Sequence, residues 1–500
     1  MNTVQLNQNN LKKIDSPVSA PAYSRDLIPA IVHIGLGHFH RAHQAVYFDT
    51  LLTKGLSRAG IFEINLIPDT APLARITGEQ DYLYPLITKS ARGEEKVRII
   101  GSVRAYLNAS GASRDAIARM ASAETNLISL TVTEKGYCYD DGADDLAWDI
   151  PGVKRDRENP AAPETTIGYL AAALALRFNT NKQPLTIMSC DNFPTNGRIL
   201  KTCVLSFCRE VYPEMVSWIE NEVAFPNSMV DRITPNTTTE TINYIKEKYG
   251  VIDAWPVCSE DFRQWVLEDS FKTIPQSVLA IRDLEQAGVQ IVQDVEPYEL
   301  MKIRLLNGSH SALSYPAYLM GYTGVAEAIE DPLLQKFIRI YYMEEITATL
   351  PPVAGIDLGV YKDTLISRFS NRNIADTILR LASDGSKKIP NAIQKALAQT
   401  VKEGLRYEAL LFALAGWARF LSGADESGKP IPLEDCNGPA ISAAAQKARE
   451  DPENFLRVIG VQGISDADLS KLAGSFKLRL EGIYKLGIRG ALEELLKKPA

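Results

Sequence analysis

Short apolar runs separated by helical stretches dominate the first three fifths of the chain. Five of these runs are predicted to be strands: 30–34, 61–67, 97–101, 127–133 and 185–189. The run 127–133 is almost continuously apolar, which is typical of a parallel strand buried on both faces. Helices are predicted over 113–123, with Ser113 as N-cap, and over 165–178. Strands that alternate with helices in this way predict an α/β domain with a parallel sheet.

The first apolar run ends in Gly35-Leu36-Gly37, and a helix is predicted to begin near Phe39. A strand, a Gly-x-Gly turn and a helix open a Rossmann unit, in which the glycines let the backbone approach a pyrophosphate. His40 stands where the third glycine of the usual motif would be. Asp69 follows the second run, where a carboxylate could accept the adenosine ribose hydroxyls and favour NAD, although one acidic residue does not exclude NADP.

The pattern changes near residue 294, beyond which strand-like runs become rare and apolar residues recur with helical spacing. We therefore expect a Rossmann-type domain over 1–293 and a mostly α-helical domain over 294–500. A chain of 500 residues fits two domains because single hydrophobic cores rarely grow so large.

The stretch 301–310 opens the second domain and places Lys302, Asn307 and His310 among apolar neighbours. At about 100° per residue in an α-helix, all three fit on one wide face. Burial can lower the pKa of a lysine until it acts as a base, and a carboxamide can hold a developing alkoxide. The structural alternative is that Lys302 reaches solvent, Asn307 caps a turn and His310 is a core residue.

Asn192 follows the run 185–189, and ligands of open α/β sheets bind beyond the carboxyl ends of the strands. Its amide could donate a hydrogen bond to a reacting oxygen, or it could only help to turn the chain before Pro194.

Composition and charge exclude several classes of protein. The net charge is −7 without a dense Lys/Arg block, which argues against a nucleic-acid surface. The sequence contains no run of about 18 apolar residues, so we expect no membrane-spanning helix. The polar N-terminus lacks a signal-peptide core, so we expect a cytoplasmic protein. Four histidines, His33, His38, His40 and His43, lie close in sequence, but no carboxylate or cysteine there completes a metal site, and we expect no metal.

Two motifs carry a family likeness. Residues 35–43 fit G-x-G-x-F-x-R-x-H, and Lys302-x-x-x-x-Asn307-x-x-His310 fits K-x-x-x-x-N-x-x-H. Both resemble signatures of the polyol-specific long-chain dehydrogenase/reductase family, the mannitol dehydrogenases. Further blocks resemble this family in the same order, so that the likeness spans nearly the whole chain: 189–192, 229–235, 264–269 and 368–371.

The resemblance implies metal-independent hydride transfer between NAD and a polyol–ketose pair. The leading candidate for this pair is D-mannitol and D-fructose. It implies that Lys302 is the general acid/base and that His310 orients the reactive oxygen. Asn192 and Asn307 would stabilise the alkoxide. The residues implied in cofactor binding are Gly35, Gly37, Phe39, Arg41 and Asp69. The residues implied in contacts with polyol hydroxyls are Asp231, Arg380 and Lys388.

Other interpretations remain open. A hexuronate reductase of the fructuronate or tagaturonate type could use Arg380 or Lys388 to meet the substrate carboxylate, and arabinitol and sorbitol dehydrogenases belong to the same family. A nucleotide-sensing protein on the same fold would be expected to lose Lys302. The segment 270–288 looks longer than in the family and could be a surface loop or border the cleft. We expect a monomer or weak oligomer that acts on a small-molecule substrate.

Overall fold

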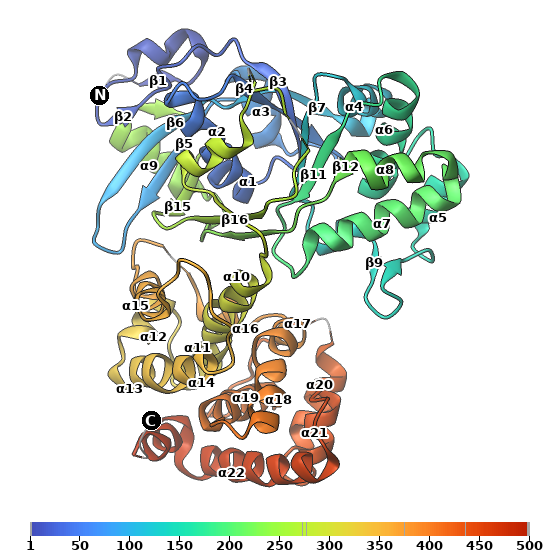
Figure 1. Ribbon diagram of the computed structural model, residues 1–500. Helices are drawn as coiled ribbons and strands as arrows, with labels where there is room; N and C mark the ends of the chain where they lie inside the picture. The colour runs from blue at the N-terminus through green and yellow to red at the C-terminus, as the bar shows by residue number, and fades with distance from the viewer. Residues whose placement is uncertain (1–2, 273, 277, 375, 436, 498–500) are drawn as a thin grey trace. The chain divides into compact units, whose positions relative to one another are not determined.

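The computed structural model describes residues 3–272, 274–276, 278–374, 376–435 and 437–497 (Figure 1). The chain divides into two compact units, Met1–Glu296 and Pro297–Ala500. The hydrophobic pattern alone puts this division at 293/294.

The first unit is built on a parallel sheet of six strands in the order β12-β11-β8-β3-β4-β7. The strands are β3 (Ile28–Ile34), β4 (Ala59–Asn65), β7 (Val103–Asn108), β8 (Leu127–Leu130), β11 (Leu185–Ser189) and β12 (Val223–Ala224). This is the order of a Rossmann fold, with its switch point between β3 and β8. The predicted fold class is therefore confirmed, although the run predicted at 97–101 lies in a different sheet.

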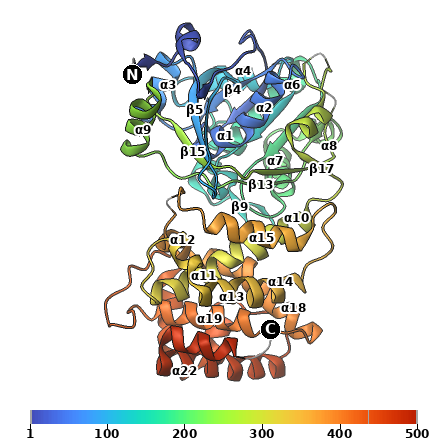
Figure 2. The same ribbon diagram turned by 90° about the vertical axis from the view of Figure 1, so that its left-hand side faces the viewer.

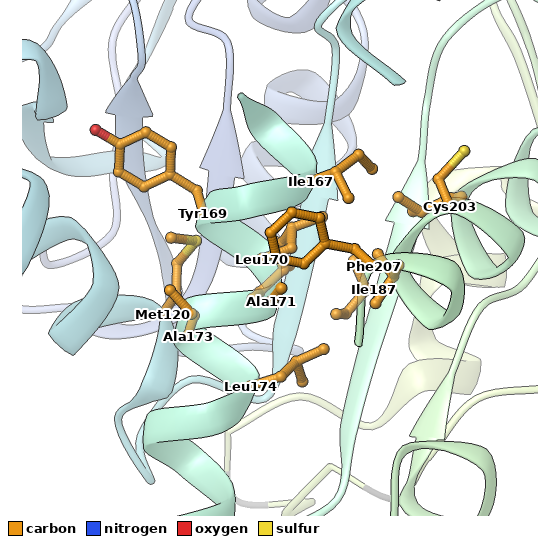
Figure 3. Close-up of a cluster of buried hydrophobic side chains, with 14 of the residues drawn as sticks. Met120, Ile167, Tyr169, Leu170, Ala171, Ala173, Leu174, Ile187, Cys203 and Phe207 are labelled. Carbon is orange, nitrogen blue, oxygen red and sulfur yellow. The ribbon is translucent and has the colours of Figure 1, made fainter. Parts of the chain in front are cut away.

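Hydrophobic residues cover both faces of this sheet because side chains alternate along each strand. On β11, Ile187 joins the cluster under one set of helices and Met188 joins the cluster on the opposite face. The first set, shown in part in Figure 3, is α4 (Ser113–Ala121), α6 (Thr166–Thr180) and α7 (Asn196–Val211). The opposite face is covered by α1 (His38–Ala42) and α2 (Gln44–Thr53). Ala112, not Ser113, occupies the N-cap of α4.

Smaller sheets complete the first unit. A four-stranded sheet contains β15 (Val257–Glu260), β5 (Tyr84–Lys89), β6 (Glu95–Ile100) and β2 (Val18–Ser19). A three-stranded sheet contains β13 (Ser228–Asp231), β16 (Gln264–Glu268) and β17 (Gln290–Val292). The remaining strand pairs are β1 (Val4–Gln5) with β14 (Val251–Ile252), and β9 (Tyr139–Asp140) with β10 (Asp145–Leu146). Further helices are α3 (Ala71–Glu79), α5 (Pro151–Glu158), α8 (Val216–Glu222) and α9 (Thr239–Tyr249).

The segment 270–288, of which residues 273 and 277 are not described, packs on α2. Its 3-10 helix η5 (Ile281–Ala287) buries Leu284 in the core of the first unit. Lys54 Nζ donates to the carbonyl of Gln286 at 2.7 Å. The described part of this segment thus contributes to the core instead of forming a detached loop.

Helices joined by loops make up the described part of the second unit, with isolated β-bridges at two places. Its helices before residue 350 are α10 (Glu296–Met301), η6 (Lys302–Asn307), α11 (Gly308–Leu319), α12 (Val325–Glu330), α13 (Pro332–Lys336), η7 (Phe337–Tyr342) and α14 (Met343–Thr347). Those after it are α15 (Leu358–Phe369), α16 (Ile378–Ala382), α17 (Gly385–Ile389), η8 (Pro390–Gln394), α18 (Lys395–Glu403), α19 (Glu408–Leu421), α20 (Gly438–Lys447), α21 (Pro452–Val458) and α22 (Asp466–Leu496). Three of them, η6, η7 and η8, are π-helical.

Helix α19 is the centre of the second unit. Nearly all of its side chains are buried, because α11 packs on one side of it and α22 on another (Figure 2). Helix α22 is long and is kinked at Gly487, whose backbone dihedral angles are not helical. In the described residues, no helix is long and apolar enough to cross a membrane.

Candidate active site

The Gly-x-Gly turn lies at the switch point of the parallel sheet. Gly35 has a φ of +109°, and a Cβ at this position would overlap the carbonyl oxygen of Thr131, so only glycine fits. Around Gly37, the nearest atom to an added Cβ is the Gly35 oxygen at 3.9 Å. The turn is therefore tightly packed at its first glycine and open at its second, which leaves room for a pyrophosphate beside the backbone. Phe39 stacks on His43 with ring centroids 4.9 Å apart.

A fully buried group of two histidines and one carboxylate lies next to this turn. Potential ligand atoms of His33, His40 and Glu63 all lie within 4.8 Å of one another. The prediction that no carboxylate completes the histidine cluster is wrong, because β4 pairs with β3 and brings Glu63 beside it. Both ring nitrogens of His33 are engaged by hydroxyls, Ser129 at 2.7 Å and Thr131 at 2.9 Å. A metal ion bound to His33 would have to replace one of these bonds.

His40 and Glu63 are in contact, with 2.7 Å between Nε2 and Oε1. An ion pair would raise the pKa of the histidine and lower that of the carboxyl group. Burial acts in the opposite direction and dominates: it lowers the pKa of His40 to about 3 and raises the pKa of Glu63 to about 7. Below neutral pH the pair is therefore best described as two neutral groups.

Arg41 lies inside the first unit with no exposed surface. Its Nη1 donates to the carbonyl of Trp255 at 2.6 Å, and its guanidinium lies 4.0 Å from the centroid of the Trp255 ring. This arginine therefore links α1 to the segment that contains Trp255. The contact of Arg41 with the cofactor stays a prediction. Because the side chain has no exposed surface, none of its atoms is accessible to a ligand in this structure.

Asp69 is exposed in the loop between β4 and α3. Its Oδ1 accepts hydrogen bonds from Asn65 Nδ2 at 3.2 Å, Asn108 Nδ2 at 2.5 Å and the hydroxyl of Tyr106. Asn65 and Asn108 are paired residues at the ends of β4 and β7. The carboxylate is thus fixed at the carboxyl end of the sheet.

Asp191, after β11, holds the loop that follows β8. Its carboxylate accepts from the amides of Val132 at 2.9 Å and Thr133 at 3.0 Å, and from the Tyr137 hydroxyl at 2.7 Å. The next residue, Asn192, is exposed at the carboxyl end of the sheet. Asp191 therefore holds the loop after β8 in place at this edge of the sheet.

Asp231, predicted to contact substrate, ends β13 and is 5% exposed. The neighbouring Arg232 donates to the carbonyls of Ala42 and Glu260.

In the second unit, Lys302 begins the π-helical segment η6 and Asn307 ends it. The expectation of an α-helix is wrong here. In an α-helix, residues five positions apart are roughly 140° apart around the axis. A π-helix forms i→i+5 hydrogen bonds, so residues five positions apart lie nearly above one another. Lys302, which is 4% exposed, and Asn307 are such a pair, so they lie on one side of the π-helical segment.

His310 lies in the first turn of α11, half-buried, with its ring 4.6 Å from that of Phe369. Gly308, two residues earlier, allows η7 to approach, because a Cβ there would overlap the hydroxyl of Tyr342. The geometry of this stretch therefore depends on packing against η7.

Arg380 and Lys388 have partners within the second unit. Arg380 forms a bidentate pair with Asp376, with both N–O distances 2.5 Å. Lys388 Nζ donates to the carbonyls of Leu381 at 3.2 Å and Arg380 at 3.4 Å, at the end of α16. Arg380 also borders a cavity of about 300 Å³ that Ser383 and Phe420 help to line.

Glu63, Tyr106 and Asn108 belong to these sites but were not predicted from the sequence. A charged residue inside the apolar run 61–67 is a visible signal for Glu63. Tyr106 and Asn108 carry no local signal, because they reach Asp69 only through the pairing of β4 with β7.

Comparisons with known proteins agree across the chain. The mannitol dehydrogenase Rossmann domain matches residues 29–278, and the mannitol dehydrogenase C-terminal domain matches residues 294–483. A mannitol dehydrogenase of Saccharomyces cerevisiae is 38% identical over 98% of this chain and 97% of its own. A mannitol 2-dehydrogenase of Aspergillus fumigatus is 39% identical over 93% of each chain.

Two solved structures share the fold over nearly the full length. The Pseudomonas fluorescens mannitol 2-dehydrogenase, in a ternary complex with NAD and D-mannitol, has a TM-score of 0.86 and 37% identity and covers 99% of this chain and 100% of its own. A D-sorbitol dehydrogenase in substrate-free form has a TM-score of 0.89 and 33% identity and covers 97% and 100%. The two domain matches and these full-length relatives establish that the chain belongs to the mannitol dehydrogenase family and is an oxidoreductase that acts on a secondary alcohol.

Proposed function

We propose that this polyol dehydrogenase interconverts D-mannitol and D-fructose with NAD as its cofactor and Lys302 as its general acid/base. The observation that carries the proposal is the buried lysine on a π-helical turn, with a carboxamide five residues on and a histidine at the start of the next helix. The full-length likeness to a mannitol 2-dehydrogenase solved with NAD and D-mannitol supports the choice of cofactor and substrate.

The residues at the switch point fit a dinucleotide. Gly35 and Gly37 would hold the pyrophosphate beside the open part of the turn, and Phe39 would border it. Asp69 would accept the hydroxyls of the adenosine ribose. When bound, the nicotinamide supplies the hydride acceptor for alcohol oxidation and the hydride donor for ketose reduction.

The remaining task of the protein is to manage one proton. Lys302 Nζ, deprotonated, takes the proton of the alcohol during oxidation and returns it to the oxygen during reduction. Asn307 and Asn192 would each donate an amide hydrogen bond to the same oxygen, and His310 would orient the substrate. Three side chains would contact the other hydroxyls of the polyol: Asp231, Arg380 and Lys388.

The placement of Arg380 and Lys388 supports a neutral polyol over a uronate. Asp376 already compensates the charge of Arg380, and Lys388 is directed to the carbonyl groups that end α16. A substrate carboxylate would have to compete with these partners. The charge arrangement therefore gives no advantage to a hexuronate.

Steady-state oxidation of NADH, and separately of NADPH, with fructose, xylulose, fructuronate and tagaturonate tests this proposal. We expect turnover with fructose and a preference for NADH. Turnover with a uronate alone would contradict the assigned substrate, and a preference for NADPH would contradict the role of Asp69.

A further inference from the structure

The Asp69 carboxylate is held by one of its two oxygens. In the described part of the chain, every hydrogen bond to this side chain ends at Oδ1, from Asn65, Tyr106 and Asn108. A carboxylate oxygen has two lone pairs, so Oδ1 is saturated while Oδ2 keeps its capacity to accept. Three donors on one oxygen fix the orientation of this exposed carboxylate.

The three donors are themselves fixed in orientation. The Nδ2 atoms of Asn65 and Asn108 also donate to the carbonyl of Ile67, both at 3.0 Å. Asn108 Oδ1 accepts from the amide of Ser110 at 2.9 Å, which determines which way its carboxamide faces. Burial and the contact with Asp69 raise the pKa of Tyr106, so its hydroxyl stays protonated and donates.

We propose that Asn65, Tyr106 and Asn108 are specificity-determining residues that fix Asp69 so that its second oxygen accepts the ribose hydroxyls of NAD and its charge opposes the 2'-phosphate of NADP. This inference rests on the proposed function, in which Asp69 meets the adenosine ribose.

The chemical nature of the three donors supports this role. All three are neutral, so they restrict the orientation of the carboxylate and leave its negative charge in place. An arginine in the same position would neutralise that charge. A freely rotating aspartate could turn away from a 2'-phosphate and accommodate NADP. A preorganised one also binds the ribose without first losing rotamer freedom. Discrimination and affinity therefore both depend on these donors.

Binding measured without turnover tests the inference. Dissociation constants for NADH and NADPH, from the fluorescence of the reduced nicotinamide, would be compared for the full-length protein, Tyr106→Phe, Asn108→Ala and Asp69→Ala. We expect Tyr106→Phe and Asn108→Ala each to weaken NADH binding about tenfold, because each loses a hydrogen bond to a charged group. NADPH binding should change less, so the NADH/NADPH preference falls by a similar factor.

A matched control is Tyr244→Phe on α9. The Tyr244 hydroxyl also donates to a carboxylate of the first unit, at 2.8 Å to both oxygens of Glu95, and this pair lies outside the cofactor site. The control should keep the cofactor preference of the unaltered protein.

The outcomes separate this inference from the assignment of Asp69. If Asp69→Ala leaves the preference unchanged, Asp69 does not face the ribose, and the assignment and the inference both fail. If Asp69→Ala abolishes the preference while Tyr106→Phe and Asn108→Ala preserve it, the assignment stands and only the inference is overturned.

Discussion

The hydrogen bonds of His33 define the state of a buried imidazole beneath the cofactor turn. The Thr131 hydroxyl donates to the carbonyl of Gly35 at 3.0 Å, so it can only accept from His33 Nε2. Nε2 therefore carries the proton, and Nδ1 accepts from the hydroxyl of Ser129. A neutral histidine thus holds the turn in place through one threonine.

Buried neutral histidines should make the first unit sensitive to acid. Burial lowers the pKa of His40 and His43 to about 3 and that of His33 well below its ordinary value. The unfolded chain gains these protons near pH 6.5 and the folded chain does not, so their contribution to stability is complete above pH 6.5 and is lost as the pH falls.

Glu63 offsets part of this effect. Burial raises its pKa to about 7, so the folded state holds one extra proton between pH 4.5 and 7. Taken together, these three histidines and Glu63 bind about two protons more in the unfolded chain near pH 5, and they should lower the free energy of unfolding by ~2.7 kcal/mol per pH unit of acidification. Urea titrations followed by tryptophan fluorescence between pH 4.5 and 6.5 measure this slope.

His43→Gln should flatten the slope, since one of the three histidines is removed while an N–H remains for the carbonyl of Gln264. A free energy of unfolding that stays constant, or rises, on acidification from pH 6.5 would contradict this account.

At the scale of elements, the stretch that contains Lys302 and Asn307 is a π-helix that packs against η7. Gly308 follows η6 directly, and the hydroxyl of Tyr342 on η7 occupies the space where any other side chain would begin. Tyr342 also donates to the carbonyl of Arg304, inside η6, at 3.4 Å. Two π-helical segments are thereby joined at the point that sets the spacing of Lys302 and Asn307.

Gly308→Ala should therefore disturb this spacing. The added methyl group meets the Tyr342 hydroxyl, and overpacking of this kind costs about 1–3 kcal/mol. We expect kcat for fructose reduction to fall at least tenfold while NADH binding by the first unit is retained.

The double variant Gly308→Ala/Tyr342→Phe provides the control, because removal of the hydroxyl leaves the nearest ring atom 3.3 Å from the new methyl group. It should recover much of the lost turnover. Equal losses in the single and double variants would show that this contact does not control the site.

The hydrophobic pattern predicted four of the six strands of the parallel sheet and missed β7 and β12. Buried parallel strands such as β8 and β11 are nearly continuous apolar runs, and Gly35 marks the turn at the switch point. The helical character of the stretch 301–310 was also predicted, and the roles of Lys302, Asn307 and His310 stay predictions.

The details of the site were not predictable from local sequence. An α-helix and a π-helix of six residues have no distinguishable period, and the choice depends on contact with η7. Glu63 and the donors to Asp69 are brought in by strand pairing between segments far apart in sequence. Such contacts require the assembled sheet.

At the scale of the whole molecule, the proposed functions are divided between the two units. The cofactor residues Gly35, Gly37 and Asp69 belong to the first, and Lys302, Asn307 and His310 belong to the second. Variants of the three cofactor residues should therefore alter cofactor binding, and variants of Lys302, Asn307 and His310 should alter the chemical step. The division is not complete, because Asn192 and Asp231, which are proposed to act on the substrate, belong to the first unit.

Removal of metal ions tests the proposal for the whole molecule. Because Lys302 is proposed to accept and return the proton, the reaction should need no metal ion. Incubation with EDTA followed by gel filtration should leave fructose reduction unchanged. A loss of activity that zinc restores would assign a metal a role that the proposed mechanism does not contain, and the group of His33, His40 and Glu63 would be the first place to look for it.

The most direct test of the account is the turnover number of Lys302→Ala with fructose and NADH, measured beside the NADH dissociation constant. Lys362→Ala is a suitable control, since Lys362 lies in the same unit and is equally buried, at 5% exposure against 4%, but pairs with Glu344. We predict that Lys302→Ala loses at least about a hundredfold in kcat with NADH affinity unchanged, because general acid/base catalysis contributes about 10²–10⁴-fold. Near-normal turnover of Lys302→Ala would contradict the assignment of Lys302 as the general acid/base.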